Sequence, residues 1–218
     1  LDIKGFFDNV NHAKLMRQMW TLGIQDKRLL CIIKEMLKAP IVLPSGEKIY
    51  PDKGTPQGGI LSPLLSNIVL NELDWWVSSQ WEDIPTHTVI KEGTAKNGTP
   101  NRSNKCRTLR RSNLKEMYIV RYADDFRIFC RKRSDAIKTY HAVKQWLEER
   151  LKLQISEEKS KVVNLKKNYS EFLGFKLKAV PRGNKHIVRS HMCDKAIQNT
   201  TKKLKAQIDY IQHPVNRK

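Results

Sequence analysis

Hydrophobic positions recur along this chain with a helical spacing in some stretches and as short β-favouring runs in others. Near the start, apolar residues three and four positions apart predict one helix between Asn11 and Gly23 and a second between Asp26 and Pro40. Asn11 and Asp26 are suitable N-caps because their side chains accept hydrogen bonds from first-turn amides. Gly23 and Pro40 are residues at which helices commonly end. Residues 41–50 then predict a β-hairpin that turns at a Pro-Ser-Gly sequence.

The rest of the chain continues this mixture of helices and hairpins. The expected elements are a helix that Ser62 caps, with Pro63 at its first position, running to about Trp76, and a helix that Ser134 caps, running to about Leu151. They are followed by strands at 171–180 and 186–189 and by a basic amphipathic helix after Ser190. This order predicts an α+β fold in which helices pack on one face of an antiparallel sheet.

The most informative stretch is Met117–Arg131, with the sequence MYIVRYADDFRIFCR. Its two runs of Val, Ile, Tyr and Phe favour strands, and Asp suits the turn between them. The stretch therefore predicts a hairpin that carries Asp124 and Asp125 at its tip. Taken alone, the pair is equally compatible with an inert, solvated acidic turn.

A third carboxylate comes from the start of the chain, where Leu1–Phe7 predicts another strand with Asp2 near its head. Three clustered carboxylates repel one another unless cations neutralise them, and hard oxygen ligands suit Mg²⁺. Two such ions about 4 Å apart are used by enzymes that transfer phosphoryl groups. The loop at residues 54–59, GTPQGG, precedes a helix N-terminus, which is a favourable place for a phosphate or a nucleotide.

Charge indicates the kind of partner. The 218 residues carry a formal net charge of +19, which favours a polyanion such as nucleic acid. No apolar run is long enough to span a membrane, so no membrane partner is expected. The four cysteines show no metal-ligand spacing and are expected to be reduced thiols of a cytoplasmic protein.

A basic stretch at about residues 86–115 lies between two of the predicted elements and has few apolar residues. Such a composition predicts a mobile insertion without a core of its own. Its cations are candidates for contact with RNA backbone, although each is also typical of a solvated surface: Lys96, Arg102, Arg107, Arg110 and Arg111.

Four motifs in order along the chain resemble those of reverse transcriptases. They are DIKGFF at 2–7, GTPQGG at 54–59, YADD at 122–125 and FLGF at 172–175. The longer phrases DIKGFFDNVNH, GTPQGGILSPLLSNIVLNELD and VRYADDF resemble proteins encoded by group II introns, known as maturases. This resemblance covers nearly the whole chain.

The resemblance implies a role for particular residues. Asp2, Asp124 and Asp125, with the backbone carbonyl of Ile3, would hold two Mg²⁺ ions, for which Mn²⁺ is an expected substitute. Lys159 would protonate the leaving pyrophosphate, or else is an ordinary surface lysine. Phe7 would exclude a ribose 2′-hydroxyl, Gln57 and Gly58 would contact the nucleotide, and Phe172, Leu173 and Gly174 would hold the primer.

The resemblance also implies a polymerase palm at 1–189 and the start of a helical thumb, or maturase region, at 190–218. The implied function is RNA-directed DNA synthesis from dNTPs on a primer, together with binding of intron RNA to assist splicing. Alternatives are a splicing cofactor without polymerase activity, and a retron or diversity-generating reverse transcriptase. The chain opens at Leu1 without the fingers residues of the family, so it is expected to be an incomplete polymerase. A homodimer and an association with the bacterial nucleoid or a ribonucleoprotein are further expectations.

Overall fold

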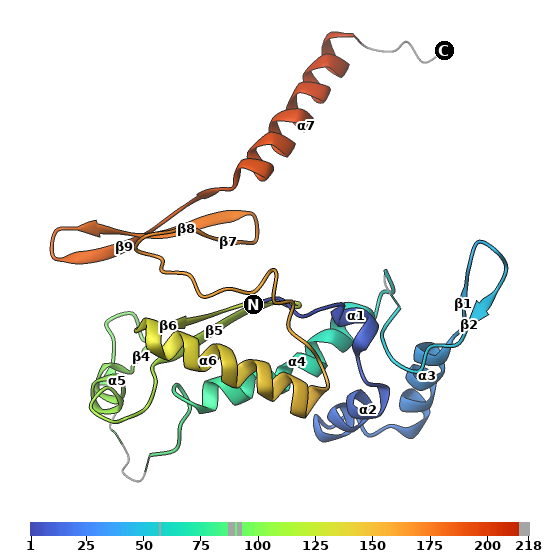
Figure 1. Cartoon of the computed structure of the whole chain (residues 1–218), viewed down its shortest axis with the longest axis horizontal. Coiled ribbons are helices and arrows are strands. Elements are labelled where there is room, and N and C mark those ends of the chain that lie inside the picture. The colour runs from blue at the N-terminus through green and yellow to red at the C-terminus, as the bar shows by residue number, and fades with distance from the viewer. Residues whose placement is uncertain (57, 87–89, 91–92, 214–218) are drawn as a thin grey trace. The chain divides into compact units, whose positions relative to one another are not determined.

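The computed structural model describes residues 1–56, 58–86, 90 and 93–213, and divides into two compact units, Leu1–Val162 and Val163–Lys218 (Figure 1). Gln57 lies outside the described residues, so its predicted nucleotide contact stays a prediction.

The first unit begins with an extended segment followed by three helices and a small hairpin. These elements are α1 (Phe6–Asn9), α2 (His12–Thr21), α3 (Lys27–Lys38), β1 (Ile41–Val42) and β2 (Lys48–Ile49). Asn11 caps α2 by accepting from the amide of Lys14, and Asp26 caps α3 by accepting from the amides of Arg28 and Leu29. Both helices and the hairpin were predicted from the sequence, and the structure confirms them.

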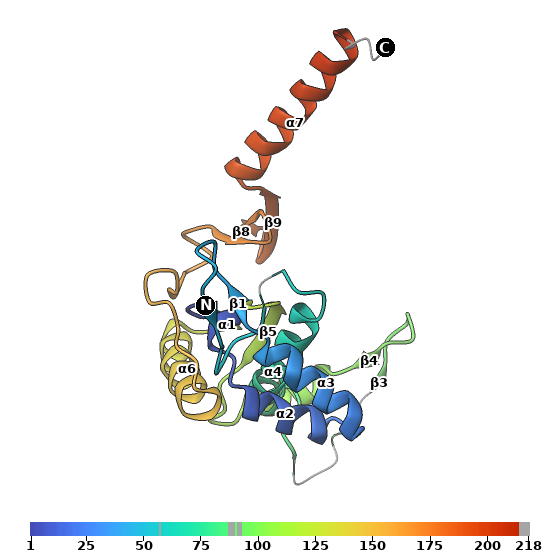
Figure 2. The ribbon, with the colours of Figure 1, turned by 90° about the vertical axis from the view of Figure 1, so that its right-hand side faces the viewer.

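The long helix α4 (Ser62–Ser79) forms the centre of the first unit. Apolar residues surround much of its circumference, which is typical of a helix buried on several sides. It packs against α2 and the central hairpin, and α2, α3 and α4 lie together in Figure 2. Pro63 lies in its first turn, as expected, but Leu61 is the N-cap because the Ser62 hydroxyl donates to the carbonyl of Pro56 instead.

The central hairpin pairs β5 (Met117–Tyr122) with β6 (Asp125–Cys130), in a register that runs from Met117 opposite Cys130 to Tyr122 opposite Asp125. It is followed by α6 (Arg133–Trp146), which continues into a π-helical turn, η1 (Leu147–Leu151). The predicted hairpin and helix are confirmed. Ser134 is not the helix cap, because α6 already begins at Arg133 after Lys132.

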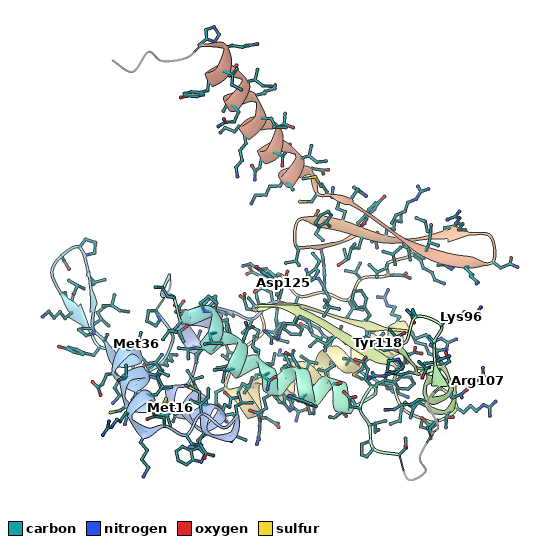
Figure 3. The ribbon with its side chains drawn as sticks, turned by 180° about the vertical axis from the view of Figure 1, so that it is seen from behind. Met16, Met36, Lys96, Arg107, Tyr118 and Asp125 are labelled. Carbon is teal, nitrogen blue, oxygen red and sulfur yellow. The ribbon has the colours of Figure 1, made fainter. Side chains whose placement is uncertain are left out.

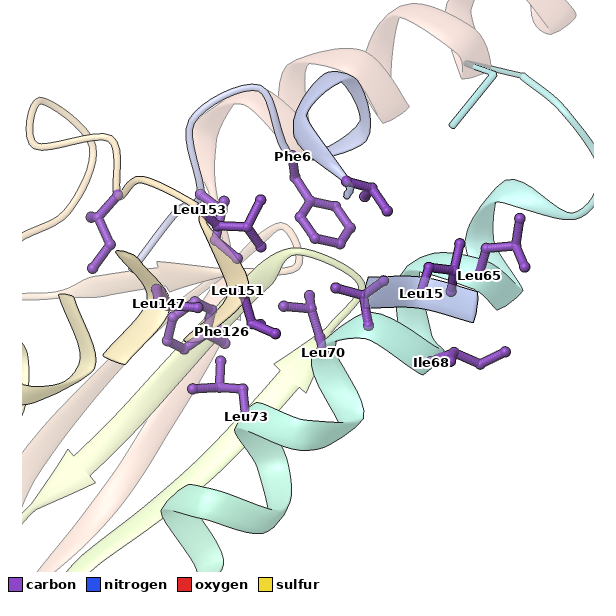
Figure 4. Packing of buried hydrophobic residues seen from close by; sticks show 14 of the residues in the cluster. Phe6, Leu15, Leu65, Ile68, Leu70, Leu73, Phe126, Leu147, Leu151 and Leu153 are labelled. Carbon is purple, nitrogen blue, oxygen red and sulfur yellow. The ribbon is translucent and has the colours of Figure 1, made fainter. Parts of the chain in front are cut away.

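The hydrophobic core forms where these elements meet. Phe126 of the hairpin, Leu70 and Leu73 of α4, and Leu147 of η1 are fully buried there, and Figure 4 shows them converging beneath the N-terminal segment. Phe6 joins the same cluster from α1. Asp125 directly precedes the fully buried Phe126, so the hairpin turn is attached to the core of the unit.

The first unit differs from the sequence prediction in two places. The predicted strand Leu1–Phe7 is only a short extended segment with one bridge, Ile3 to Ile155. It stops because Gly5 adopts a left-handed conformation (φ 51°) and α1 begins directly after it. In the basic stretch, the described residues form β3 (Gly93–Thr94), β4 (Pro100–Asn101) and α5 (Ser103–Leu109), elements that were not predicted from the sequence, while the mobility of this insertion stays a prediction.

The second unit contains a three-stranded antiparallel sheet and a helix. Its elements are β7 (Ser170–Phe172), β8 (Phe175–Arg182), β9 (Lys185–Met192) and α7 (Asp194–Gln212). The predicted single strand at 171–180 is interrupted at Leu173-Gly174, because both residues have positive φ and form a turn. The expected basic helix is confirmed as α7.

The fold class is therefore α+β, with several small antiparallel sheets in place of the one sheet that was predicted. Among the described residues, none of the helices has both the length and the apolar character needed to cross a membrane.

Candidate functional site

The extended segment Leu1–Lys4 lies between two other parts of the chain. On one side, the amide of Phe126 in β6 donates to the Leu1 carbonyl (3.4 Å), and the Leu1 amine donates to the Phe126 carbonyl (2.9 Å). On the other side, the amide of Lys4 donates to the Gln154 carbonyl (2.8 Å). Asp2 is thereby placed beside the end of β6 that carries Asp125.

The hairpin turn consists of Ala123 and Asp124, because Tyr122 and Asp125 form the last pair of the ladder. Ala123 has a φ of 52°, an uncommon conformation for a residue with a side chain. Asp124 and Asp125 are both half-buried. Asp125 accepts a hydrogen bond from Arg127, with which it forms an ion pair. A metal ion at Asp125 must therefore compete with Arg127 for the carboxylate.

The backbone of Asp2 is fixed by a turn at residues 156–160. The Ser156 amide donates to the Asp2 carbonyl (2.9 Å), and the Asp2 amide donates to the Ser160 hydroxyl (3.0 Å). Lys159 belongs to this turn and is exposed. The structure thus brings Lys159 to the same segment as Asp2, whereas its role in protonation stays a prediction.

The glycine-rich loop is attached to the backbone near Phe7. The Thr55 amide donates to the Phe7 carbonyl (2.6 Å), and the Gly54 amide donates to the Val10 carbonyl (2.7 Å). His12 Nε2 lies 2.7 Å from the Gly54 carbonyl. A side chain at Gly54 would lie 3.0 Å from the Phe7 carbonyl oxygen, so only glycine permits this close approach.

Phe7 itself is half-buried in α1 and makes an edge contact with Phe6, with ring centroids 5.4 Å apart. Gly58 is exposed and has a φ of 78°. The loop and the predicted ribose gate therefore lie on neighbouring backbone segments, as their predicted contact with one nucleotide requires.

The predicted primer-holding residues belong to the second unit. Phe172 and Phe175 form a pair across a two-residue turn made by Leu173 and Gly174. The Cys193 amide donates to the Gly174 carbonyl (2.8 Å), which joins the turn to the start of α7. Leu173 is exposed at this turn.

The predicted RNA-binding cations cluster at the opposite end of the central hairpin from the acids. Figure 3 shows Lys96 and Arg107 near Tyr118, and Asp125 at the other end. One face of α5 lines an open pocket of about 670 Å³, formed by Arg102, Ser103, Cys106, Arg107, Arg110 and Arg111. The arginines on this face carry the charge that attracts a phosphate backbone.

A chain of polar contacts joins α5 to the central hairpin. Arg110 donates two hydrogen bonds to Glu116, at 2.9 and 2.6 Å, and these hold the pKa of the Glu116 carboxyl below its usual value. The Tyr118 hydroxyl donates to Glu116 and accepts from the buried Trp81. Arg110 is therefore paired with Glu116 within the protein, whereas the sequence suggested it only as a candidate for contact with RNA.

Reasoning from sequence missed the residues that hold the acids in place. Ser160 and Arg121 have no catalytic chemistry of their own, although Arg121 belongs to the VRYADD phrase. Arg121 contacts both helix α4 and the turn carbonyl of Ala123. Both residues became recognisable only from their contacts.

The acids provide hard oxygen donors of the kind that Mg²⁺ prefers. Within the part of the chain that the structure describes, however, no three His, Cys, Asp or Glu side chains are grouped closely enough to hold a metal. The neighbouring carboxylates are thus incomplete as a metal site without other ligands. Enzymes that transfer phosphoryl groups with divalent ions use carboxylate oxygens of this kind as ligands.

The chain belongs to the reverse transcriptase (RNA-dependent DNA polymerase) family, whose model matches residues 1–177. Its relatives include the group II intron-encoded protein LtrA of Lactococcus lactis subsp. cremoris, which is 30% identical, with 81% of this chain and 34% of LtrA covered. The predicted resemblance to proteins of group II introns is therefore confirmed.

Two further relatives agree with this assignment. Protein YkfC of Escherichia coli K12 is 28% identical, with 81% of this chain and 45% of YkfC covered. The putative COX1/OXI3 intron 2 protein of Saccharomyces cerevisiae is 26% identical, with 83% of this chain and 24% of that protein covered. The chain spans between about a quarter and a half of the length of these relatives.

Proposed function

We propose that this protein is an RNA-directed DNA polymerase of a group II intron, and that residues 1–189 are its palm. The observation that carries the proposal is the pairing of Leu1 with Phe126, because it sets Asp2 beside the turn that carries Asp124 and Asp125. Residues 190–218 would begin the thumb. The proposed partners are an RNA template, a DNA primer and dNTPs, within a ribonucleoprotein that contains the intron RNA.

Asp2, Asp124 and Asp125 would hold two Mg²⁺ ions, together with the carbonyl of Ile3. Successive carbonyls in an extended segment point to opposite sides. The Leu1 carbonyl accepts from Phe126 of the hairpin and the Asp2 carbonyl accepts from Ser156, so the Ile3 carbonyl faces the hairpin side again. Substrate phosphates complete such sites in other enzymes, which agrees with an incomplete site in their absence.

When bound, the two ions lower the pKa of the primer 3′-hydroxyl and stabilise charge on the leaving pyrophosphate. The protein then contributes mainly position and charge. To serve as a metal ligand, Asp125 would have to give up its ion pair with Arg127, and Lys159 would supply a proton to pyrophosphate. Phe7 closes the space beside the nucleotide ribose, and Gly58 lets the backbone approach the nucleotide. Phe172, Leu173 and Gly174 hold the primer end.

The test is primer extension by the intact protein on an RNA template with dNTPs and Mg²⁺. Asp124→Ala should abolish extension and leave the fold intact, because it removes a metal ligand from a solvent-accessible turn. Asp52→Ala, which removes an exposed carboxylate in the first unit, should retain activity. Full extension by Asp124→Ala would contradict the proposal.

The arginine-lined face of α5 favours a second function, binding of intron RNA to assist splicing. Arg107 and Arg111 are exposed on that face, whereas Arg110 is paired with Glu116. Each phosphate contact should contribute about one unit to the slope of log affinity against log salt. RNA binding driven in this way does not need the carboxylates.

The second function is tested by RNA binding as a function of salt. Changing Arg107 and Arg111 to Gln should reduce the slope by about two units in total. The matched change Arg110→Gln should alter the slope less, because that side chain is already neutralised within the protein. An unchanged slope in the Arg107 and Arg111 variant would exclude this face as the RNA contact. Splicing that survives Asp124→Ala would show that the two functions are separate.

A further inference from the structure

The Arg121 side chain connects the turn that carries the acids to the central helix. It is only 11% exposed. Its Nε lies 2.9 and 3.0 Å from the two carboxylate oxygens of Asp74, and one terminal nitrogen lies 2.6 Å from Asp74 Oδ2. The other terminal nitrogen donates to Asn67 Oδ1 and to the Ala123 carbonyl, each at 2.9 Å.

These contacts make a rigid connection. Asp74 and Asn67 both lie on α4, whose Leu70 and Leu73 are fully buried in the core. A guanidinium group is planar and presents its donors in a fixed fork. When Asp74 and Asn67 set the position of that fork, the remaining bond fixes the carbonyl of Ala123 relative to α4.

The residue at the other end of this connection is strained. Ala123 has a φ of 52° and immediately precedes Asp124. The strand pairing ends at Tyr122 and Asp125, so it does not hold the two turn residues, Ala123 and Asp124. A conformation of this kind persists only where surrounding contacts determine it, and the bond from Arg121 is such a contact.

We propose that Arg121 is a positioning residue, which holds the turn so that Asp124 and Asp125 face the same metal ions. The proposal rests on the polymerase function proposed above. A purely structural ion pair between α4 and β5 would stabilise the first unit without affecting the turn. A positioning residue, in contrast, must alter the turn when it is removed. Groups that orient metal ligands without touching the metal typically change metal affinity or activity by about 10–100-fold when they are removed.

The experiment compares three variants of the intact protein. Arg121→Gln removes the charge and the fork, and Arg121→Lys keeps the charge but cannot make the forked set of bonds. Glu72→Gln is the matched control. Glu72 is also on α4 and binds Lys14 and Arg150, but these contacts lead to α2 and η1 and not to the turn.

The first readout, hydrogen exchange of the amides at residues 122–125, does not depend on activity. Both Arg121 variants should raise exchange there by about tenfold, which corresponds to the loss of one hydrogen bond. Glu72→Gln should leave the turn unchanged relative to the rest of the hairpin. Equal exchange at the turn in wild type and Arg121→Gln, or an equal rise in Glu72→Gln, would overturn the proposal.

The second readout is the Mg²⁺ concentration that gives half-maximal primer extension. It should rise about 10–100-fold in Arg121→Gln and remain near the wild-type value in Glu72→Gln. The KM for dNTP at saturating Mg²⁺ should change less than this. An unchanged Mg²⁺ requirement in an active Arg121→Gln would refute the positioning role. If wild type itself does not extend primers, the proposed function fails, while the exchange data still decide whether Arg121 holds the turn.

Discussion

Gly54→Ala is the most informative test of how the glycine-rich loop is attached near Phe7. Gly54 has a φ of 95°, and a methyl group there would lie 3.0 Å from the Phe7 carbonyl oxygen and 3.1 Å from that of Asp8. Two separate penalties follow. Adopting this φ with a side chain costs about 1–3 kcal/mol, and crowding rigid backbone atoms costs about 1–3 kcal/mol more.

Gly23→Ala separates these two penalties. Gly23 has almost the same φ, 92°, but a methyl group there would meet nothing within 4 Å. We therefore expect Gly54→Ala to lower the free energy of unfolding by about 1–3 kcal/mol more than Gly23→Ala does. The close contact at the Phe7 carbonyl is the reason for this difference.

The assay is urea denaturation followed by tryptophan fluorescence. All five tryptophans of the chain lie within Leu1–Val162, so the signal reports the unit that contains both glycines. In the intact protein, Gly54→Ala should also raise the KM for dNTP, whereas Gly23→Ala should not. Equal destabilisation by the two substitutions would refute the close packing of the loop against the Phe7–Asp8 backbone.

Three further predictions concern other parts of the first unit. Ser160→Ala leaves the partly buried amide of Asp2 without its acceptor and should cost about 1 kcal/mol, measured by the same denaturation assay; a loss below about 0.3 kcal/mol would contradict that bond. Phe7→Ala should raise the use of rNTPs relative to dNTPs in primer extension, and an unchanged ratio would remove Phe7 as the ribose gate. The folded-state pKa of Glu116 is lowered by Arg110 from its ordinary value of 4.5, so its contribution to stability is present above that value and is lost as pH falls through the folded-state pKa. Glu116→Gln should therefore lose less stability than wild type between about pH 6 and pH 3; parallel losses would contradict the pairing.

Local sequence signals predicted much of the fold because their physical causes are local. The caps at Asn11 and Asp26 bind amides within their own helices, so the residues alone were sufficient. The hairpin at 117–130 was predicted because β-favouring runs flank an acidic turn. In contrast, Ser62 was misread as a cap because its hydroxyl donates to Pro56 outside the helix, a contact that helix propensities do not include.

For the candidate site, the sequence predicted the residues that have recognisable chemistry but not the residues that support them. Asp2, Asp124 and Asp125 were predicted because the motifs that contain them resemble those of reverse transcriptases, and their role as metal ligands stays a prediction. The arrangement around them depends on contacts between distant residues, such as Arg121 with Asp74 and Asp2 with Ser160. A single sequence contains no signal for such pairs, so the support of the site had to come from the structure.

The bonds between Asp2 and the turn at Ser156–Ser160 have a consequence for the order of events during synthesis. Asp2 leaves the ribosome 158 residues before Ser160, its partner. Closing a loop of this length is entropically unfavourable until other contacts compensate for it, and such long-range pairings form slowly. A nascent chain therefore carries Asp2 long before it can hold this residue in place. Under the proposed function, competence for metal chemistry should arise only after the first unit has been completed, which would delay any reaction with nucleotides until the protein is folded.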